Sequence, residues 1–380
     1  MIWLSWISLT CILLYAGWFL QSAKQLLFAK KKSLPAYSHS QYTVPNTTLI
    51  VPFKNEEAHI PGIFEDAAHQ KFPFEKLTMH AVNDHSEDTS QISARNSIGK
   101  YPFHIEVFNL ADKYHGKKAA LTHGVEGSKS ELIVCRDADT IARDANWLLS
   151  MCAPFQNEAI HLVIAPVLLS PKKGFLFTFQ QMENLALQAM FYASSLSETP
   201  LGCSGANMAF RRDSFLKANP FLENRNIPSG DDMFLLQAFE KRRFKQCFIN
   251  APVLTPACES WQSMLTQRVR WASKWPHLKS PFVKIGGTLV TLAGLSCLFS
   301  LTTLLFNIGF PLVGLFSLII KFSIDLLLLF LGARIFRQKV WWRWFLPGFI
   351  LNVFYTPLLV LCAPFLKINW KNSGADVRKT

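Results

Sequence analysis

The sequence has little that would support a disulfide-bonded or zinc-bound fold. Its eight cysteines form no C-x-x-C pair, and no group of histidines stands near them at a zinc-ligand spacing. A chain of 380 residues also has enough length to build a core without disulfides. These absences argue against a disulfide scaffold and a zinc-finger type of protein, and we expect reduced, mostly buried thiols.

Charged residues are scarce, and acidic residues are scarcer than basic ones. Charged side chains make up 17% of the chain, and 39 Lys and Arg stand against 26 Asp and Glu, which gives a net charge of +13. Much of the basic excess flanks apolar segments, as at Lys30, Lys31 and Lys32 and again between residues 268 and 284. This placement is typical of cytoplasmic flanks near anionic headgroups, so we predict a membrane partner and no nucleic acid.

The apolar residues concentrate at the two ends of the chain. Residues 2–20 carry no charge and approach the roughly 20 apolar residues that span a bilayer. Because this stretch lacks a basic start and an A-x-A-like exit, we interpret residues 1–23 as an uncleaved anchor rather than a signal peptide. The triple lysine that follows predicts that the domain over residues 45–280 is cytoplasmic.

The C-terminal region, residues 282–366, predicts two or three further spans. Residues 282–336 are long enough for two, with a hairpin around residues 307–311. The prolines within residues 344–366 leave a re-entrant or interfacial segment as an alternative to a third span. If all cross, the basic tail over residues 367–380 lies outside, against the positive-inside tendency. Either one segment does not cross, or the rule fails here.

Residues 45–260 alternate β-rich runs with helical patterns, which predicts an α/β domain with a largely parallel sheet. We expect a helix from Glu56, and four strands at residues 47–53, 77–84, 104–110 and 131–139. Ligands of such sheets bind beyond the carboxyl ends of the strands. The polar groups that follow these strands are therefore expected in one crevice: Asn55-Glu56-Glu57, Asn83-Asp84 and Asp137-Ala138-Asp139.

Three short motifs carry candidate chemistry. Asp137 and Asp139 suit a hard divalent cation that also bridges phosphate oxygens. A strand-terminal D-x-D also occurs in aspartyl-phosphate phosphohydrolases, but those need Thr or Val where this chain has Ile141. Asp231 and Asp232 begin a helical run, where they serve either as capping carboxylates or as a general base.

Two further segments have both a functional and a structural interpretation. The run from Gln267 to Trp271 offers Arg for phosphate and Trp for a sugar or apolar tail, or it is a juxtamembrane helix. The small residues 202–207 form either a turn or a floor where the backbone approaches an acceptor. The apolar helix predicted at residues 175–193, with Gln180, Gln181 and Glu183 on a polar stripe, is expected to pack in the core or on the membrane surface.

In this order the segments LIVPFKNEEAHI, VNDHSEDTS, HGKKAAL, CRDADT, GCSGANMAFRR, SGDD and QRVRW resemble the family-2 glycosyltransferases, which are membrane-associated inverting enzymes with a GT-A fold. The resemblance implies a role for each matching residue. It implies that Pro52, Glu56 and Asp84 contact the nucleoside and that Lys117 lies near the donor. It implies that Asp139, with Asp137, holds a Mg or Mn diphosphate and that Asp232 is the catalytic base. Gln267, Arg270 and Trp271 would lie at the acceptor and diphosphate mouth.

Two positions depart from the family pattern. Asn83 stands where many members carry a first Asp, and Asp231 stands where Glu often precedes the base. The second departure leaves open which of Asp231 and Asp232 is the base.

The resulting prediction is an integral protein of a bacterial inner membrane with a cytoplasmic GT-A domain. It would move a sugar from a UDP- or GDP-sugar to a membrane lipid or glycan acceptor, with inversion and a divalent cation. The alternative is a non-catalytic, nucleotide-sugar-binding membrane subunit of a polysaccharide or glycolipid assembly system. The short C-terminal region looks small for a polymer channel, which favours one or few transfers.

Overall fold

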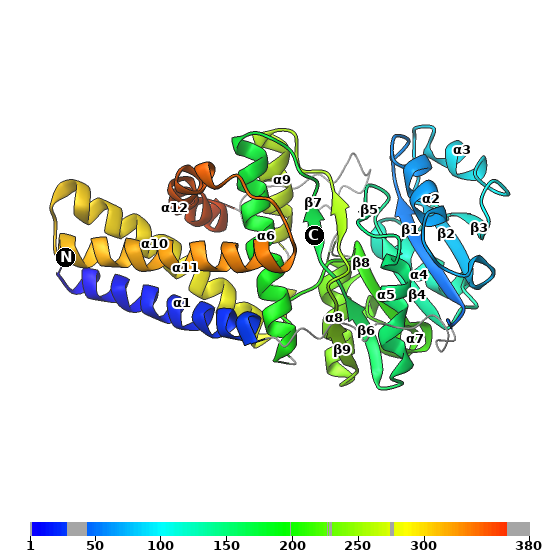
Figure 1. The fold of residues 1–380 in the computed structure, drawn as a ribbon, viewed down its shortest axis with the longest axis horizontal. Helices are drawn as coiled ribbons and strands as arrows, with labels where there is room; N and C mark the ends of the chain where they lie inside the picture. The colour runs from blue at the N-terminus through cyan, green and yellow to red at the C-terminus, as the bar shows by residue number, and fades with distance from the viewer. Residues whose placement is uncertain are drawn as a thin grey trace.

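The computed structural model describes residues 2–28, 44–197, 199–225, 227, 230–273 and 277–362. An α/β half and a helical half lie at opposite ends of the molecule (Figure 1). Several basic residues of the sequence argument lie outside the described residues: Lys30, Lys31, Lys32, Lys274, Lys367, Lys371, Arg378 and Lys379.

The α/β prediction is confirmed, and the larger sheet is mixed: among its described strands, four pairings are parallel and two are antiparallel. The described strands of the larger sheet run in the order β3-β2-β1-β4-β8-β6-β9. The first four of these pair in parallel, whereas β8 is antiparallel to both of its neighbours. Their bounds are β1 Thr47–Phe53, β2 Leu77–Asn83, β3 His104–Asn109, β4 Leu132–Arg136, β6 Ile160–Ile164, β8 Asn207–Arg211 and β9 Lys245–Phe248.

The direction of β8 follows from the path of the chain. After β6 the chain leaves for the long helix α6 (Phe175–Leu196) and returns through residues 202–206. It re-enters at Asn207, which pairs with Arg136 at the carboxyl end of β4. A strand that enters the sheet where β4 ends must run against it.

The predicted strands are close to those observed, but the helix predicted from Glu56 begins later. The helix α2 spans Ile60–Ala68. Asn55 has a φ of 54°, a left-handed conformation that turns the chain out of β1, and Pro61 occupies the first helical turn, where proline fits best. Asp137 and Asp139 likewise lie beyond β4, which ends at Arg136.

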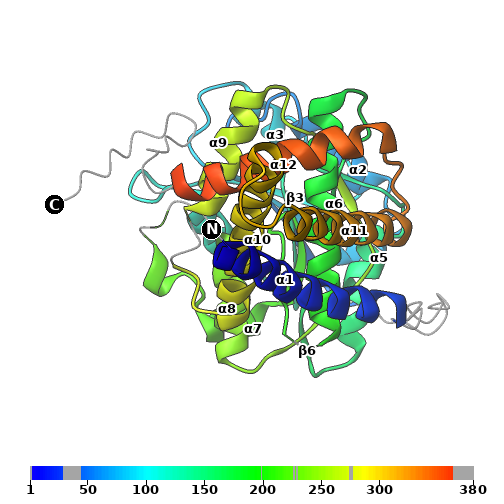
Figure 2. The same ribbon diagram turned by 90° about the vertical axis from the view of Figure 1, so that its left-hand side faces the viewer.

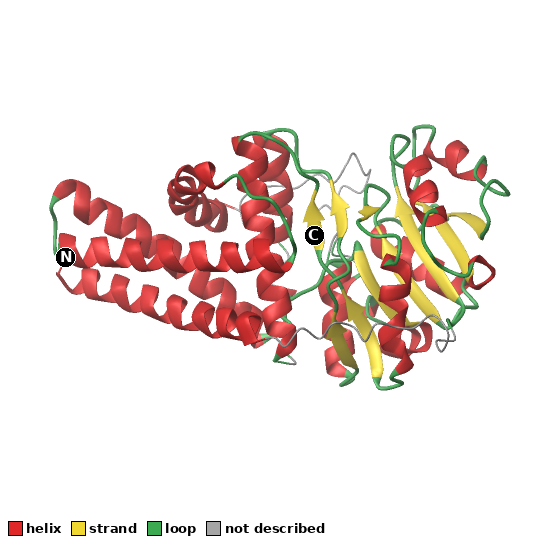
Figure 3. Ribbon diagram, in the orientation of Figure 1, coloured by secondary structure: helices red, strands yellow, loops and turns green. Residues whose placement is uncertain are grey.

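Helices cover both faces of the larger sheet (Figure 3). Leu49 and Val51 join the apolar cluster under one face and Ile50 the cluster under the other, because successive strand side chains point to opposite sides. The covering helices are α2, α3 (Ser90–Arg95), α4 (Lys117–Gly127), α5 (Trp147–Cys152), α7 (Arg212–Ala218) and α8 (Asp231–Lys241). A small sheet of β5 (Ile141–Ala142), β10 (Val253–Thr255) and β7 (Val167–Leu169) lies beside them.

The helical half holds the apolar segments of the sequence. Within the described chain, four helices are long and apolar enough to cross a membrane: α1 (Ile2–Phe28), α10 (Pro281–Phe306), α11 (Pro311–Ile335) and residues Trp342–Val360, which contain most of α12 (Phe345–Cys362). The first three run lengthwise side by side (Figure 1), and α12 lies across them (Figure 2). The predicted hairpin between α10 and α11 is present, and α1 continues past the predicted end of the anchor to Phe28.

The helices α6 and α9 (Trp261–Ala272) lie between the two halves (Figure 1). Leu185 and Ala189 of α6 belong to the same apolar cluster as Ile12 of α1 and Leu328 of α11. Core packing, as predicted for this helix, is therefore one of its roles.

Candidate active site

A cavity of about 520 Å³ lies between the carboxyl end of β4 and the helices α6 and α9. Four acidic residues from two separate segments line one wall: Asp137, Asp139, Asp231 and Asp232. The lining also includes Gln267, Arg270 and Trp271 of α9, together with residues of α6. Segments far apart in the sequence therefore meet in one cavity.

Lys117 connects two of these acidic segments. Its ammonium lies 2.5 Å from a carboxylate oxygen of Asp137 and 3.2 Å from one of Asp231. Burial alone would lower the pKa of Lys117, but the carboxylates of Asp137 and Asp231 outweigh burial and raise it. Lys117 is therefore a fixed cation at the start of α4, between the end of β4 and the start of α8.

The small segment at residues 202–206 leaves room for this ion pair. A Cβ atom added to Gly205 would lie 2.3 Å from a carboxylate oxygen of Asp231 and 3.3 Å from the ammonium of Lys117. Gly205 thus fits because it has no side chain, in agreement with the close backbone approach expected for this segment.

Asp139 lies in a crowded group of negative charges. Burial raises its pKa to about 6, and the neighbouring carboxylates of Asp137 and Glu56 add to the shift. The hydroxyl of Thr255 donates a hydrogen bond of 3.3 Å to it. Carboxylates crowded in this way favour a bound cation, and an all-oxygen ligand set suits Mg²⁺ or Mn²⁺.

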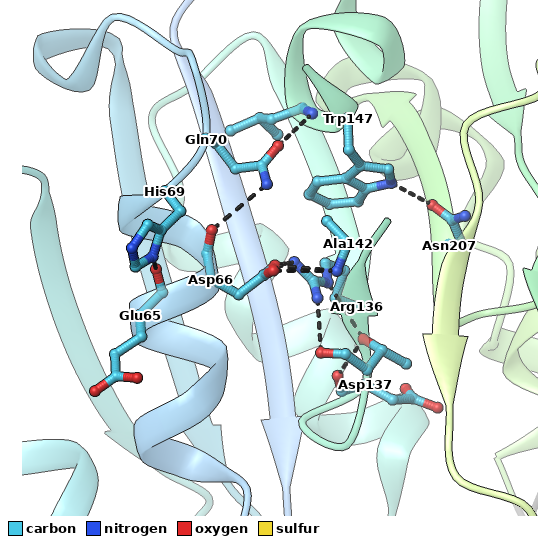
Figure 4. A network of polar contacts seen from close by, with 11 residues as sticks. Glu65, Asp66, His69, Gln70, Arg136, Asp137, Ala142, Trp147 and Asn207 are labelled. Carbon is cyan, nitrogen blue, oxygen red and sulfur yellow. Dashed lines mark hydrogen bonds and ion pairs between the residues drawn. The ribbon is translucent and has the colours of Figure 1, made fainter. Parts of the chain in front are cut away.

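A buried arginine holds the turn that carries these aspartates (Figure 4). Arg136 is fully buried, its guanidinium lies 2.5 Å from a carboxylate oxygen of Asp66 on α2, and it donates a 2.7 Å hydrogen bond to the carbonyl of Thr140. The ring of Trp147 packs against this guanidinium and donates from its indole N–H to Asn207. The side chain of Arg136, held by Asp66, therefore fixes the turn over residues 137–140.

Neither Arg136 nor Asp66 was assigned a role from the sequence. A charged residue at the end of an apolar strand was visible in the motif CRDADT, but its partner lies on α2, 70 residues earlier. No local pattern indicates such a pair.

The two aspartates at the start of α8 lie in different surroundings. Asp231 is buried and pairs with Lys117, whereas Asp232 is half-buried and lines the cavity. One carboxylate oxygen of Asp232 accepts a 2.8 Å hydrogen bond from the backbone N–H of Met233. Both lie in the first turn of a helix, so the capping interpretation and the functional one apply to the same residues.

The helix α9 also presents polar residues to the cavity. Burial lowers the pKa of Arg270, while the carboxylates of Asp231, Asp137 and Asp232 act to raise it. The guanidinium of Arg270 is therefore close enough to interact with these carboxylates. The adjacent Arg268 is buried, lies 3.1 Å from a carboxylate oxygen of Glu183 on α6, and packs against the ring of Trp271.

The helix α6 contributes residues that the sequence analysis did not place in the site. Gln180, Asn184 and Gln188 line the cavity at the i, i+4, i+8 spacing of one helix face. Gln180 also exchanges two hydrogen bonds of 2.9 Å with the backbone of Cys258. The spacing of the amide side chains was the signal that could have identified this face.

Three residues predicted at the site are absent from the lining of this cavity as described: Pro52, Glu56 and Asp84. Pro52 is part of β1 and pairs with Val82. Glu56 is close enough to raise the pKa of Asp139, and Asp84 accepts a 2.9 Å hydrogen bond from the N–H of Gly116, beside Lys117. These residues therefore lie along the same sheet edge, next to the acidic wall.

Comparisons with known proteins find similarity to glycosyltransferases. A family model described as Glycosyl transferase family 2 matches residues 48–217. A probable glycosyltransferase, YdaM, from Bacillus subtilis is 22% identical over 71% of this chain and 65% of its own length. A beta-monoglucosyldiacylglycerol synthase from Trichormus variabilis is 23% identical over 61% of this chain. This chain spans about half of that synthase, 49% of its length.

A solved structure of similar fold covers both halves of the molecule. It is a mannosyltransferase from Pyrobaculum calidifontis, described in complex with GDP-Man and Mn²⁺, which is 17% identical with a TM-score of 0.57. The likeness covers 94% of this chain and 97% of that one. At this identity it shows a shared fold.

Proposed function

We propose that this chain, which carries a glycosyltransferase family 2 domain, is a membrane-bound enzyme that transfers a sugar from a nucleotide-diphosphate donor. The observation that carries the proposal is the cavity in which Lys117, two pairs of aspartates and the Gln267–Trp271 segment converge. Such a site needs cations for the diphosphate and a carboxylate for the acceptor hydroxyl, and this cavity has both.

The donor is proposed to lie along the edge of the sheet. Pro52, Glu56 and Asp84 would contact its nucleoside, and Lys117 and Asp137 would face its diphosphate. Asp139, with Asp137, would hold a Mg²⁺ or Mn²⁺ ion, and the crowding of carboxylates around Asp139 supports this assignment. When bound, such an ion stabilises the negative charge of the leaving diphosphate.

Asp232 is the proposed base. It would accept the proton of the acceptor hydroxyl as that oxygen bonds to the anomeric carbon, while the sugar–phosphate bond breaks and its electron pair leaves with the nucleoside diphosphate. Attack opposite the leaving group gives inversion. The ion pair of Asp231 with Lys117 supports Asp232 rather than Asp231 in this role.

A lipid acceptor is favoured by the apolar residues that line part of the cavity. Its lining includes Leu187, Phe191 and Leu201, and also Leu278 and Val283. Val283 belongs to α10, one of the candidate membrane helices. An acceptor that stays in the membrane would therefore reach the aspartates without leaving the lipid surface entirely.

For the membrane, we propose three crossings, with α12 on the cytoplasmic surface. The α10–α11 hairpin lies at the same end of the bundle as the N-terminal residues, since the N–H of Phe310 donates to the hydroxyl of Ser5. The helix α12 lies across the bundle near the α/β half (Figures 1 and 2). This arrangement places the basic tail in the cytoplasm and removes the conflict with the positive-inside tendency.

Reporter fusions after Thr380 test this topology. A fluorescent protein that matures only in the cytoplasm should fluoresce when fused at this position. A phosphatase that is active only outside the cytoplasm should be inactive when fused at the same position. The opposite pattern would mean that α12 crosses the membrane.

Donor turnover tests the enzyme. Detergent-purified wild type, supplied with Mn²⁺ or Mg²⁺ and with membrane lipids as acceptors, should release nucleoside diphosphate from one member of a UDP- and GDP-sugar panel. The Asp139→Ala variant should not. Equal release by both proteins would refute the assigned site, and no release by either would favour the non-catalytic subunit.

A further inference from the structure

A second group of candidate metal ligands lies at the sheet edge, outside the acidic pair at residues 137 and 139. Asp84 and His85 follow β2, and His115 precedes α4. One potential ligand atom from each lies within 4.8 Å of the other two. The topology brings them together because β2 and β3 pair in parallel, so the loop after β3 starts beside the end of β2.

His85 is held in an unusual conformation. Its φ is 55°, a left-handed value that is uncommon for a residue other than glycine. Its ring packs against the ring of His115 with centroids 4.4 Å apart. Strained backbone that gathers imidazoles and a carboxylate is typical of functional sites.

The ring nitrogens of His85 identify where a ligand is missing. Nδ1 lies 3.2 Å from a carboxylate oxygen of Asp84. Nε2 is buried and has no hydrogen-bond partner among the described residues, and a carboxylate oxygen of the exposed Asp112 lies 3.8 Å from it. A buried polar atom left without a hydrogen bond is rare and costly, so a ligand bound to this nitrogen would be favourable.

We propose that Asp84, His85 and His115 bind a divalent transition-metal ion, with Asp112 within reach as a fourth ligand. Imidazole nitrogens with carboxylates favour Zn²⁺ or Co²⁺ over Mg²⁺, so this site differs in kind from the all-oxygen group around Asp139. The N–H of Gly116 already donates to the other oxygen of Asp84, which fixes that carboxylate as outer partners of metal ligands do.

Occupancy of this site would act on the catalytic cavity through two neighbours. His115 is separated only by Gly116 from Lys117, so an ion would tether the loop that positions this cation. Asp84 is also the proposed nucleoside contact, and an ion on its carboxylate would compete with the donor. This consequence, unlike the site itself, rests on the proposed function, and it predicts inhibition by Zn²⁺.

Direct binding to the full chain tests the site without any need for activity. Chelator-treated protein in detergent is titrated with Zn²⁺ by calorimetry and with Co²⁺ by visible absorption, which reports nitrogen ligation. Wild type should bind about one ion per chain. His115→Ala should weaken the binding at least about tenfold, since changes even to outer-shell partners of a metal cost that much.

Three further variants make the result specific. His85→Asn should also weaken the binding, and asparagine tolerates the left-handed backbone at this position. The matched control His104→Asn, an exposed histidine on the neighbouring strand, should bind as wild type does. Asp139→Ala should also retain the ion. Unchanged binding by His115→Ala and His85→Asn would overturn the proposal, as would loss confined to Asp139→Ala.

Activity then separates this proposal from the transferase. Micromolar-range Zn²⁺ should inhibit donor turnover by wild type, and His115→Ala should relieve the inhibition while it retains turnover without Zn²⁺. Equal inhibition of both proteins would overturn the link to the donor. Zn²⁺ binding by a chain that never turns over a donor would refute the transferase and leave the site standing, and turnover without Zn²⁺ binding would do the reverse.

Discussion

The α/β half and the helical half each bury a charged pair, but the two pairs do different work. Arg136 and Asp66 come from different elements, and their contact fixes the turn that carries Asp137 and Asp139. Lys321 and Asp325 lie one turn apart on α11 and neutralise each other. The hydroxyl of Tyr15 donates 2.7 Å to Asp325, so this pair also ties α1 to α11.

The comparison teaches that sequence separation decides what a buried pair can position. In a local pair, each charge offsets the free-energy cost of burying the other, and this cost is high in a membrane. A pair between distant elements also sets the position of both. We therefore expect changes in the α/β half to affect catalysis and folding together, and changes in the helical half to affect assembly of the bundle.

The largest expected effect is on turnover. Asp232→Asn should lower the rate by about 10²–10⁴-fold, because a general base contributes that much. The matched control is Asp213→Asn, an exposed aspartate in the first turn of α7, which has the same helix position but no cavity contact. Similar losses in both variants, measured as nucleoside diphosphate released, would mean that the helix start and not the base matters.

Asp66→Ala should break the distant pair with the largest cost in stability. It leaves the fully buried Arg136 without its counter-ion, which typically costs about 3–5 kcal/mol. Glu131→Ala removes the partner of Arg211 at an exposed pair and should cost below about 1 kcal/mol. Thermal unfolding of the two variants measures the difference, and a loss no larger for Asp66→Ala would contradict a positioning role for the pair.

Asp325→Ala tests the local pair of the helical half. It leaves Lys321 unpaired among apolar helices, at a cost of roughly 2.5–3.5 kcal/mol at most on membrane-insertion scales. Tyr15→Phe removes only one hydrogen bond and should cost about 0.6 kcal/mol, the average for such bonds in membranes. Yield of folded protein in mild detergent should follow that order, with turnover per folded molecule unchanged in both.

The smallest effect concerns the pH dependence of the protein without a cation. Asp139 has its pKa raised to about 6 in the folded state, so the folded state holds the proton more tightly than the unfolded chain does. This contribution is fully present below about pH 4 and is lost as the pH rises through about 6.

Asp139→Asn should therefore stabilise the cation-free protein at pH 8 and leave it nearly unchanged at pH 4. The expected gain is at most about 3 kcal/mol, since the pKa is raised by about two units and one unit corresponds to about 1.4 kcal/mol. Thermal unfolding in the presence of a chelator measures it. An equal shift at both pH values would show that Asp139 does not carry this charge cost.

Several features of the fold followed from local patterns. The β-rich runs predicted the first four strands to within a few residues, and long apolar runs predicted the helices α1, α10 and α11. The predicted start of α2 was wrong because the left-handed turn at Asn55 interrupts the helical pattern, and the helix begins only at Ile60, with Pro61 in its first turn. The direction of β8 could not be predicted, since it depends on where the chain returns from α6.

By itself, the sequence determined the α/β class, the apolar ends and the set of polar motifs that belong together, because each is a property of neighbouring residues. Only the tertiary structure decided which carboxylate pairs with Lys117, that Arg136 reaches Asp66, that α6 turns its amides into the cavity, and that two histidines meet Asp84. These contacts join residues many positions apart, and their geometry depends on the packing of whole elements, which no local pattern of side chains encodes.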